Sequence, residues 1–314
     1  MHYKWNQTNE DLEAAFQNMT ANVVTVGGFL TFFLVFYVNQ THNRYFQFHG
    51  ESMVLMGRVS DVATMVRAVL PMARARRINR YMNVAHVATY TGLSTTYDKD
   101  NFFDPLEARF ALLTKEELHR VVQEIDVDKS GPKVAFELIT WVMCDIQDAQ
   151  TNGVINPFEA FQLRDLILRF RSTIAKIHVM ATLPIPFFYV HFLSLLTTIY
   201  LPLFAVVVAY ETGVDGSGSY ALEIVSVLVV VLQALFVIGL RCLGQQLSDP
   251  YKGEFIDLQV ARYVSMILTG SNQILAAKRL CPPSADTEVR LQLKMAALGE
   301  AFEYDTDDEC VDQD

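Results

Sequence analysis

The sequence predicts an all-α membrane protein, in which a transmembrane helical bundle is joined to a large cytosolic helical domain. The first observation is a run of 32 residues, 179–210, that contains no Asp, Glu, Lys or Arg. The second is an apolar run at residues 220–240, which follows a short polar loop rich in Gly, Ser and Asp. Because a helix needs about 20 apolar residues to cross a bilayer, the two runs predict a transmembrane hairpin over residues 179–240.

The overall composition indicates that the chain has both apolar spans and a large polar part. Of the 314 residues, 51% are hydrophobic and 19% are charged, and the formal net charge is −10. This charged fraction is low for a soluble protein and high for a bare membrane bundle, so apolar spans must be joined to a large part that sits in water. The acidic balance argues against nucleic acid as a partner, since phosphates require a basic surface.

Residues 1–20 are expected to form an outward-facing helix start, because Thr8 can cap a helix whose first turn contains Glu10 and Asp11. The helix would continue through residues 21–38, an uncharged and strongly aromatic stretch that predicts a third span. This stretch is short and contains Gly27 and Gly28, so a buried helix of a soluble domain is the alternative interpretation.

Residues 39–178 hold most of the charge and predict the cytosolic helical domain. Six arginines follow the third span closely: Arg58, Arg67, Arg74, Arg76, Arg77 and Arg80. The loop at 211–219 has no Lys or Arg, so the positive-inside rule places this domain, and everything after Arg241, in the cytosol. Within the domain, Thr114 and Glu117 form a capping box that starts one helix, and apolar spacing predicts another over residues 158–171.

Residues 241–281 are expected to form a juxtamembrane segment and a cytosolic helix, and residues 282–314 have the composition of an acidic flexible tail. The juxtamembrane segment combines a Pro/Gly turn with the carboxylates of Asp249, Glu254 and Asp257. Turn carbonyls together with carboxylates are the ligands that a hard cation such as Ca²⁺ requires. A polar turn without a cation is the alternative.

A second calcium motif matches residues 126–137. In the numbering of an EF-hand loop, the ligand positions 1, 3, 5 and 12 are occupied by Asp126, Asp128, Ser130 and Glu137. Gly131 stands at position 6, where the loop requires glycine, but Lys133 occupies position 8, where an aliphatic residue normally pairs two loops. A solvated helix–turn–helix corner is therefore the competing interpretation.

Phe32 and Phe36 lie four residues apart and therefore on one face of the helix expected at 21–38. Aromatic side chains in a span commonly face lipid or a neighbouring helix. The functional alternative is a narrow apolar constriction, because the edge of a phenyl ring is electropositive and can favour a partly dehydrated anion.

No catalytic constellation emerges, so we expect a protein that is not an enzyme. The seven histidines are dispersed, and the sequence contains no zinc-protease, nucleophile-elbow or phosphate-loop motif. His191 lies within a predicted span and Glu223 near the start of the last one. One further hypothesis is an enzyme or a proton-coupled transporter that uses these two residues. The competing interpretation is that His191 is a hydrogen-bonded interior histidine and that Glu223 is an interfacial carboxylate.

Three stretches resemble the bestrophin family of pentameric anion channels. Residues 36–46 read FYVNQTHNRYF and are similar to the family's second transmembrane helix. Residues 185–189 read IPFFY and resemble its entry into the third span. Residues 246–251 read QLSDPY and, with two carboxylates beyond, resemble its QLxNPF…D..D signature. The order and spacing match over roughly residues 8–270.

The resemblance implies a homopentamer with a pore along its five-fold axis, lined by the helix at 21–38. By position, the hydrophobic neck falls on Gly28, Phe32 and Phe36. Gly28 stands where a bulky aliphatic residue is usual, so that end of the neck is expected to be wider. The cytosolic aperture falls on Phe158, where a smaller aliphatic residue is common, so the lower constriction is expected to be narrower.

The family's calcium clasp carries over to Gln246 and Asp249 through backbone oxygens, and to Glu254 and Asp257 through carboxylates. Glu254 replaces an Asp, which keeps the charge and alters the reach. The resemblance therefore implies Ca²⁺ as a cofactor and chloride or bicarbonate as the permeant ion.

The family has four spans, and this sequence matches from just before the second, so we expect a truncated gene rather than a natural three-span channel. Family members occupy plasma membranes in animals and thylakoids in photosynthetic cells. The expected function is a calcium-responsive anion channel in contact with membrane lipid. A membrane-anchored, EF-hand-like calcium-binding regulator without ion flux is the alternative.

Overall fold

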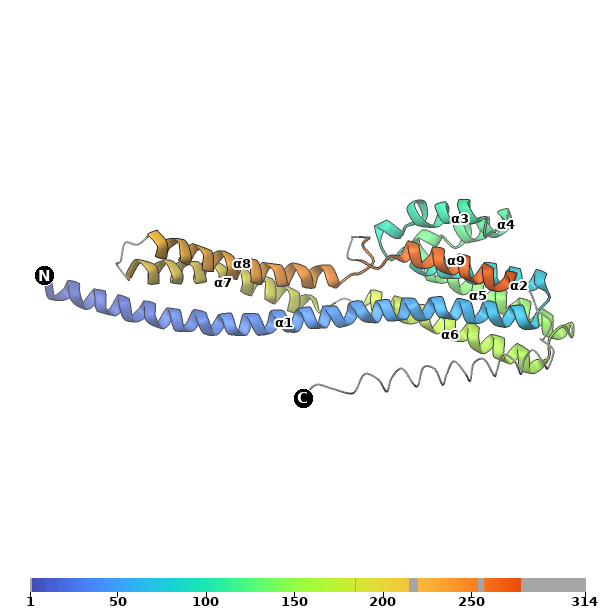
Figure 1. Ribbon diagram of the computed structural model, residues 1–314, viewed down its shortest axis with the longest axis horizontal. Helices are drawn as coiled ribbons and strands as arrows, with labels where there is room; N and C mark the ends of the chain where they lie inside the picture. Colours follow the sequence, from blue (N-terminus) through green and yellow to red (C-terminus); the bar gives the residue numbers. More distant parts are fainter. Residues whose placement is uncertain (1, 184, 215–219, 254–256, 278–314) are drawn as a thin grey trace, which may run out of the picture. The chain divides into compact units, whose positions relative to one another are not determined.

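The computed structural model describes residues 2–183, 185–214, 220–253 and 257–277 (Figure 1). Over these residues the chain is helical and contains no strand, which confirms the predicted fold class. The α-helices are α1 (His2–Val69), α2 (Met72–Tyr90), α3 (Asp104–Phe110), α4 (Lys115–His119), α5 (Val127–Thr151), α6 (Pro157–Thr182), α7 (Phe187–Val214), α8 (Tyr220–Leu247) and α9 (Val260–Ala276). Three short segments add a 3₁₀-helix, η1 (Thr95–Tyr97), and two π-helices, η2 (Lys99–Phe103) and η3 (Arg120–Glu124).

A single long helix, α1, belongs to both the apolar and the charged part of the chain. It begins at His2 rather than Thr8, and it passes residue 38, the expected end of the first span, without interruption. Its later half carries charged residues but keeps helical spacing, because Leu55, Val59, Val62 and Val66 fall on one side and are fully buried. The predicted span and the start of the charged half are therefore parts of one helix.

Three helices are long and apolar enough to cross a membrane, as expected from the sequence. The candidate spans are Met19–Val69 within α1, Phe187–Thr212 within α7 and Glu223–Leu247 within α8. The bounds of the hairpin differ from the prediction, since residues 179–182 belong to α6 and α8 continues to Leu247. Apolar character alone did not separate the end of α6 from the start of α7, because both sides of the break are uncharged.

The first half of α1 packs along α7 and α8 (Figure 1). Leu34 and Tyr37 of α1 are buried together with Tyr200 of α7 and Val237 of α8. Gly27 allows the close approach, because a Cβ atom at this position would lie 2.5 Å from the Tyr200 hydroxyl oxygen. These contacts fix which side of α1 is buried and which side faces outward.

The second half of α1 packs against α2 and α6, and α2 packs against α5 (Figure 1). The shared core contains fully buried side chains from each element, including Val62, Met82, Leu138, Phe170 and, from α9, Leu268. This core contains the greater part of the chain's buried apolar side chains. It provides the rigid base on which the polar turn after α8 is held.

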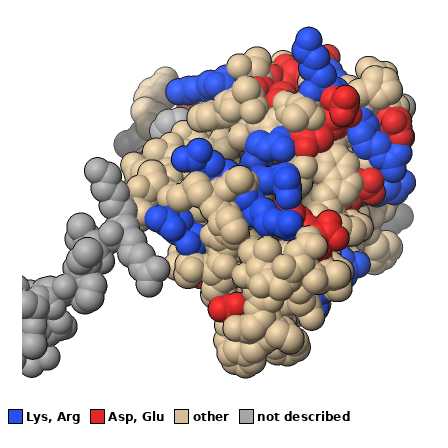
Figure 2. All heavy atoms as spheres, turned by 90° about the vertical axis from the view of Figure 1, so that its right-hand side faces the viewer, with Lys and Arg blue, Asp and Glu red and all other residues tan. Residues whose placement is uncertain are grey.

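Two of the arginines on which the positive-inside prediction was based also connect helices of this core. Asp145 of α5 is 7% exposed and accepts hydrogen bonds from Arg74 at 3.1 Å and from Arg77 at 2.6 Å, both on α2. Pairing offsets the cost of burying the carboxylate. On the face drawn in Figure 2, basic and acidic side chains lie close together, as expected for a part of the protein that sits in water.

The predicted capping box at Thr114 is confirmed. The Thr114 side chain accepts from the Glu117 backbone amide, and the Glu117 carboxylate accepts from the Thr114 amide. Glu117 also accepts from the Arg80 guanidinium and the Tyr81 hydroxyl. Burial opposes ionisation of this carboxyl, but the hydrogen bonds outweigh it and lower the pKa of Glu117 to about 2. The Glu117 side chain therefore caps α4 and also connects α4 to α2 through hydrogen bonds.

Candidate functional site

The predicted neck residues lie together on one exposed stripe of α1. Gly28, Phe32 and Phe36 are four residues apart, and the two phenylalanine side chains are 66% and 51% exposed. On the opposite side of the same turns, Leu30 and Leu34 are completely buried. Both rings therefore point away from the packed interior. On this exposed side they can contact a pore, lipid or another subunit.

A shallow groove of about 530 Å³ follows this stripe and is lined by Thr25, Gly28, Phe29, Phe32 and Phe33. Nothing lies within 4 Å of a Cβ atom built on Gly28, so a side chain at this position would meet open space. The rings of Phe32 and Phe33 meet edge to face, with their centroids 5.8 Å apart. A larger residue at Gly28 could therefore be accommodated by the chain itself.

The segment at 185–189 reaches back to the neck stripe. The Tyr189 hydroxyl donates a hydrogen bond of 2.8 Å to the Phe33 carbonyl oxygen. The Tyr189 ring meets the Phe36 ring edge to face, with centroids 6.4 Å apart. Two of the three sequence motifs are thus in contact, and the start of α7 restrains the orientation of Phe36.

Phe158, the predicted aperture residue, lies in the first turn of α6 and is 68% exposed. The turn is well defined, since the Asn156 side chain accepts from the Glu159 amide at 2.8 Å and the Glu159 carboxylate accepts from the Asn156 amide at 2.9 Å. Pro157 occupies the first helical position, which suits its fixed φ angle. The capped helix start projects the Phe158 ring away from the core.

The predicted clasp residues surround the turn between α8 and α9. Gln246 lies in the last turn of α8, Asp249 lies just beyond it, and Asp257 is only 8% exposed. The turn is closed by a 3.0 Å hydrogen bond from the Leu258 amide to the Pro250 carbonyl oxygen. Glu254 lies outside the described residues, so the structure places three of the four clasp residues.

Aromatic side chains of this turn pack into the larger core. Tyr251 is 1% exposed, its hydroxyl lies 3.2 Å from the Ser52 hydroxyl of α1, and its ring packs edge to face on Phe48 at 5.2 Å. Burial raises the pKa of the Tyr251 phenol. Gly253 has a φ of 87°, a backbone conformation that favours glycine. Tyr251 therefore anchors the first part of the turn to α1.

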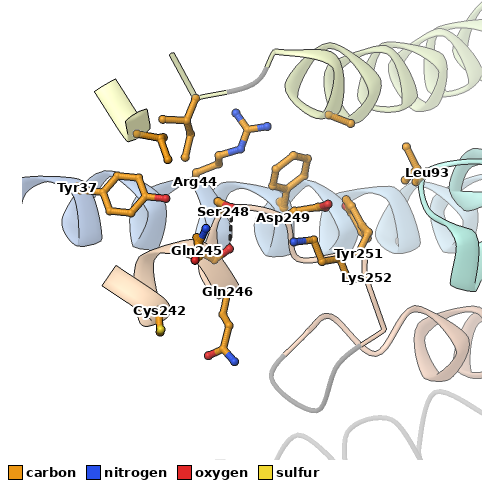
Figure 3. Close-up of a pocket in the computed structure, with 14 residues that line it drawn as sticks. Tyr37, Arg44, Leu93, Cys242, Gln245, Gln246, Ser248, Asp249, Tyr251 and Lys252 are labelled. Carbon is orange, nitrogen blue, oxygen red and sulfur yellow. Dashed lines mark hydrogen bonds between the residues drawn. The ribbon is translucent and has the colours of Figure 1, made fainter. Parts of the chain in front are cut away.

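A cavity of about 750 Å³ lies beside the turn (Figure 3). Its polar wall includes Arg44 of α1, Gln245 of α8, and Ser248, Asp249 and Lys252 of the turn. Its apolar wall comes from α1, α6, α7 and the connection between α6 and α7. The cavity thus lies where the candidate span helices meet the larger of the two buried cores.

Arg44 is the residue at this site that the sequence reasoning left without a role. Its guanidinium donates to the carbonyl oxygens of Met180 at 2.5 Å and Leu183 at 2.6 Å, at the C-terminal end of α6. Such carbonyls have no helical partner and carry partial negative charge, so a cation there is favourable. A lone arginine six residues after the uncharged span at 21–38 was the signal in the sequence, but its partners are 136 and 139 residues away.

The weaker calcium motif at 126–137 does not have the backbone of an EF-hand loop in this structure. Helix α5 begins at Val127 and includes Gly131 and Glu137, so the backbone has no loop that could wrap around a cation. The Glu137 carboxylate instead accepts hydrogen bonds from Arg120 at 3.2 Å and from the Trp141 indole at 3.3 Å. Asp126 precedes the helix with a φ of 63°, and no side-chain arrangement is described for Asp128 and Ser130.

The part of the chain that the structure describes contains no group of three His, Cys, Asp or Glu side chains arranged to hold a metal ion. His191 is exposed on α7 and stacks on Phe187 with ring centroids 4.9 Å apart, so it is not the interior histidine that was expected. Glu223 is exposed in the first turn of α8. Neither residue belongs to a described polar site.

Comparison with known proteins relates this arrangement to one family. Residues 5–272 match the family model described as Bacterial/Fungal Bestrophin protein. A crystal structure of a bacterial bestrophin homolog from Klebsiella pneumoniae is similar with a TM-score of 0.67 and 16% sequence identity, covering 82% of this chain and 88% of that one. Another crystal structure, of a membrane protein, is similar with a TM-score of 0.70 and 15% identity, covering 82% and 87%. No curated protein matches.

Proposed function

This chain belongs to the bacterial and fungal bestrophin family, and from that premise we propose that it is a calcium-responsive anion channel whose neck is formed by Phe32 and Phe36. Membership of a family of channels and the shared fold support an anion-channel function in a membrane. The observation that carries the finer proposal is the exposed stripe of α1, where two rings point away from a completely buried opposite side.

Anion selection would follow from the chemistry of these rings. Several copies of α1 around a common axis would present rings of phenylalanine side chains to a permeating ion. The electropositive edge of each ring can favour a weakly hydrated anion over a cation without binding it tightly. Chloride and bicarbonate are the anions that we propose to pass, by passive conduction through a homopentamer.

The neck is proposed to be asymmetric along its length. Gly28 leaves a groove of about 530 Å³ at one end of the stripe, whereas Phe36 at the other end is restrained by Tyr189. The narrow part would therefore begin at Phe32. Phe158, exposed at the capped start of α6, is proposed as the second constriction, at the cytosolic aperture.

The turn after α8 is the proposed calcium site. Backbone oxygens of Gln246 and Asp249, with the carboxylates of Glu254 and Asp257, would supply the hard oxygen ligands that Ca²⁺ prefers. The closed turn and the buried Asp257 carboxylate are consistent with such a site. When bound, Ca²⁺ would stabilise the open arrangement relative to the closed one and so shift the population of channels.

We expect replacement of the neck rings to weaken anion selectivity. In a planar bilayer with a tenfold chloride gradient, a chloride-selective pore reverses at about 59 mV in magnitude. The Phe32→Ala and Phe36→Ala variants are expected to reverse closer to zero, with larger conductance, because the apolar constriction is widened. Gly28→Val is expected to lower the conductance, since its side chain fills the groove.

Phe236→Ala is the matched control for the neck, because Phe236 on α8 is 51% exposed, like Phe36. It should leave the reversal potential unchanged. A reversal potential that moves equally in Phe36→Ala and Phe236→Ala would contradict the assignment of the neck to α1.

The calcium site predicts a separate effect on activation. In Asp257→Asn, the calcium concentration for half-maximal current should rise about tenfold, because the site loses one charged ligand. The conductance of an open channel should stay the same, since Asp257 is not in the neck. Asp100→Asn, which changes a carboxylate that is 87% exposed, is the control and should not alter activation. Unchanged calcium dependence in a folded Asp257→Asn protein would rule out this site.

A further inference from the structure

The cavity beside the turn after α8 has a pattern of charges that the channel proposal leaves unused. Asp249 and Lys252 line it from the turn and Arg44 from α1 (Figure 3). Among the described residues, the Asp249 carboxylate has no hydrogen-bond partner and no cation within 4.0 Å, although its charge acts on the Arg44 guanidinium across the cavity. The Lys252 ammonium likewise has no described ion-pair partner. One carboxylate and two cations therefore border a single space.

Arg44 adds a donor that the protein does not satisfy. Two of its nitrogens hold the end of α6, but its Nε atom is buried and has no hydrogen-bond acceptor among the described residues. A buried N–H without a partner is costly, and such groups in folded proteins commonly meet water or a ligand. An acceptor with negative charge in the cavity would satisfy it.

The remaining wall of the cavity is apolar, and one of its residues, Val190, belongs to the candidate span Phe187–Thr212. It is lined by Phe48, Leu93, Ala181, Ile185 and Val190. Because α7 begins at Phe187 and α8 ends at Leu247, the cavity lies at the ends of two spans, where lipid headgroups meet water. A ligand that suits both walls must be amphipathic.

We propose that this cavity binds the headgroup of a zwitterionic phospholipid that carries a primary ammonium, such as phosphatidylethanolamine. The ammonium would donate to the Asp249 carboxylate, and the phosphate would accept from Lys252 and from Arg44 Nε. A volume of about 750 Å³ is sufficient for such a headgroup. The acyl chains would continue along the apolar wall. Soluble phosphoethanolamine has the same polar groups but lacks the chains that this wall would contact.

The proposal does not depend on ion conduction or on calcium, and its test measures lipid binding alone. The purified full chain is incubated in detergent and a calcium chelator with phosphatidylethanolamine, phosphatidylcholine or phosphatidylglycerol of matched acyl chains, and retained lipid is measured by native mass spectrometry. Phosphatidylethanolamine should be retained about tenfold more than the other two, because only its ammonium can form charge-assisted hydrogen bonds with a carboxylate.

Variants of the two turn residues test the assigned contacts. Asp249→Asn should reduce the preference for phosphatidylethanolamine over phosphatidylcholine to about onefold, because its charged acceptor is lost. Asp249→Glu should keep the preference, and Lys252→Gln should weaken retention of all three lipids. Lys176→Gln, a surface change on α6, is the control for loss of one positive charge and should bind like the unaltered protein.

Equal retention of the three lipids by the unaltered protein would overturn the proposal, and so would an unchanged preference in Asp249→Asn. Should Asp249→Asn fail to fold, Lys252→Gln decides, because full lipid retention in that variant contradicts the phosphate contact. Displacement of bound lipid by millimolar phosphoethanolamine would show that the soluble compound is the ligand and would overturn the assignment to a lipid.

Discussion

Replacing Gly131 of α5 with alanine is expected to destabilise the core that α2 and α5 share. A Cβ atom on Gly131 would overlap the carbonyl oxygens of Ala88 and Thr91, which belong to the last turn of α2 and its cap. These are backbone atoms, so a rotamer change cannot relieve the overlap. Overpacking of this kind costs about 1–3 kcal/mol or more. The thermal midpoint of unfolding should fall by several degrees, at about 2–4 °C for each kcal/mol.

The matched control is Gly270→Ala in α9. Nothing lies within 4 Å of a Cβ atom at this position, and alanine is a better helix former by about 1 kcal/mol, so the midpoint should stay or rise. The experiment also separates packing from calcium binding. If Gly131 served a calcium loop, its replacement would matter only with calcium present. A loss of stability that persists in a chelator supports the packing role, and a loss that disappears there would contradict it.

Acidification below pH 6.5 is expected to destabilise the protein through His86. This residue of α2 is completely buried, and neither ring nitrogen has a hydrogen-bond partner among the described residues. Burial lowers the pKa of His86 from 6.5 to about 3. Below pH 6.5 the unfolded chain therefore binds a proton that the folded chain does not, so stability is unaffected above pH 6.5 and is lost progressively as the pH falls toward 3. The slope should approach about 1.4 kcal/mol per pH unit.

His86→Leu should remove one proton from this pH dependence. At neutral pH its effect on stability should be small, because the variant loses an edge-to-face contact with Tyr90 at 5.4 Å but also loses two unsatisfied nitrogens. Melting curves from pH 7.5 to 4.5 in detergent provide the measurement. Identical slopes for the unaltered protein and His86→Leu would show that His86 is not the titrating group.

Local patterns in the sequence were sufficient to predict the features that depend only on residues close together in the chain. The three spans follow from runs of uncharged residues, because the cost of burying charge in a bilayer acts on every residue separately. The capping box at Thr114 and the helix that includes residues 158–171 follow from contacts within four residues of each other. The neck stripe on α1 follows from helical periodicity, since Phe32 and Phe36 must share a face.

Features that depend on contacts between residues far apart in the sequence could not be predicted from local patterns. The pattern at 126–137 has the residue types of a calcium loop, yet Gly131 serves the packing of α5 on α2, and composition alone does not distinguish a turn glycine from a packing glycine. The continuity of α1 through residue 38 depends on α6 and α2, which cover its charged half. The ties from Arg44 to the end of α6 and from Ser52 to Tyr251 join residues 136 to 199 positions apart.

The sequence by itself determined the helical fold class, the spans and the exposed stripe of α1, because these follow from hydrophobicity and helical period. Only the tertiary structure showed that Arg44, Asp249 and Lys252 border one cavity, and that His86 is buried with no hydrogen-bond partner among the described residues. The physical reason is that burial and charge pairing depend on which distant segments surround a residue, and no local pattern encodes that neighbourhood.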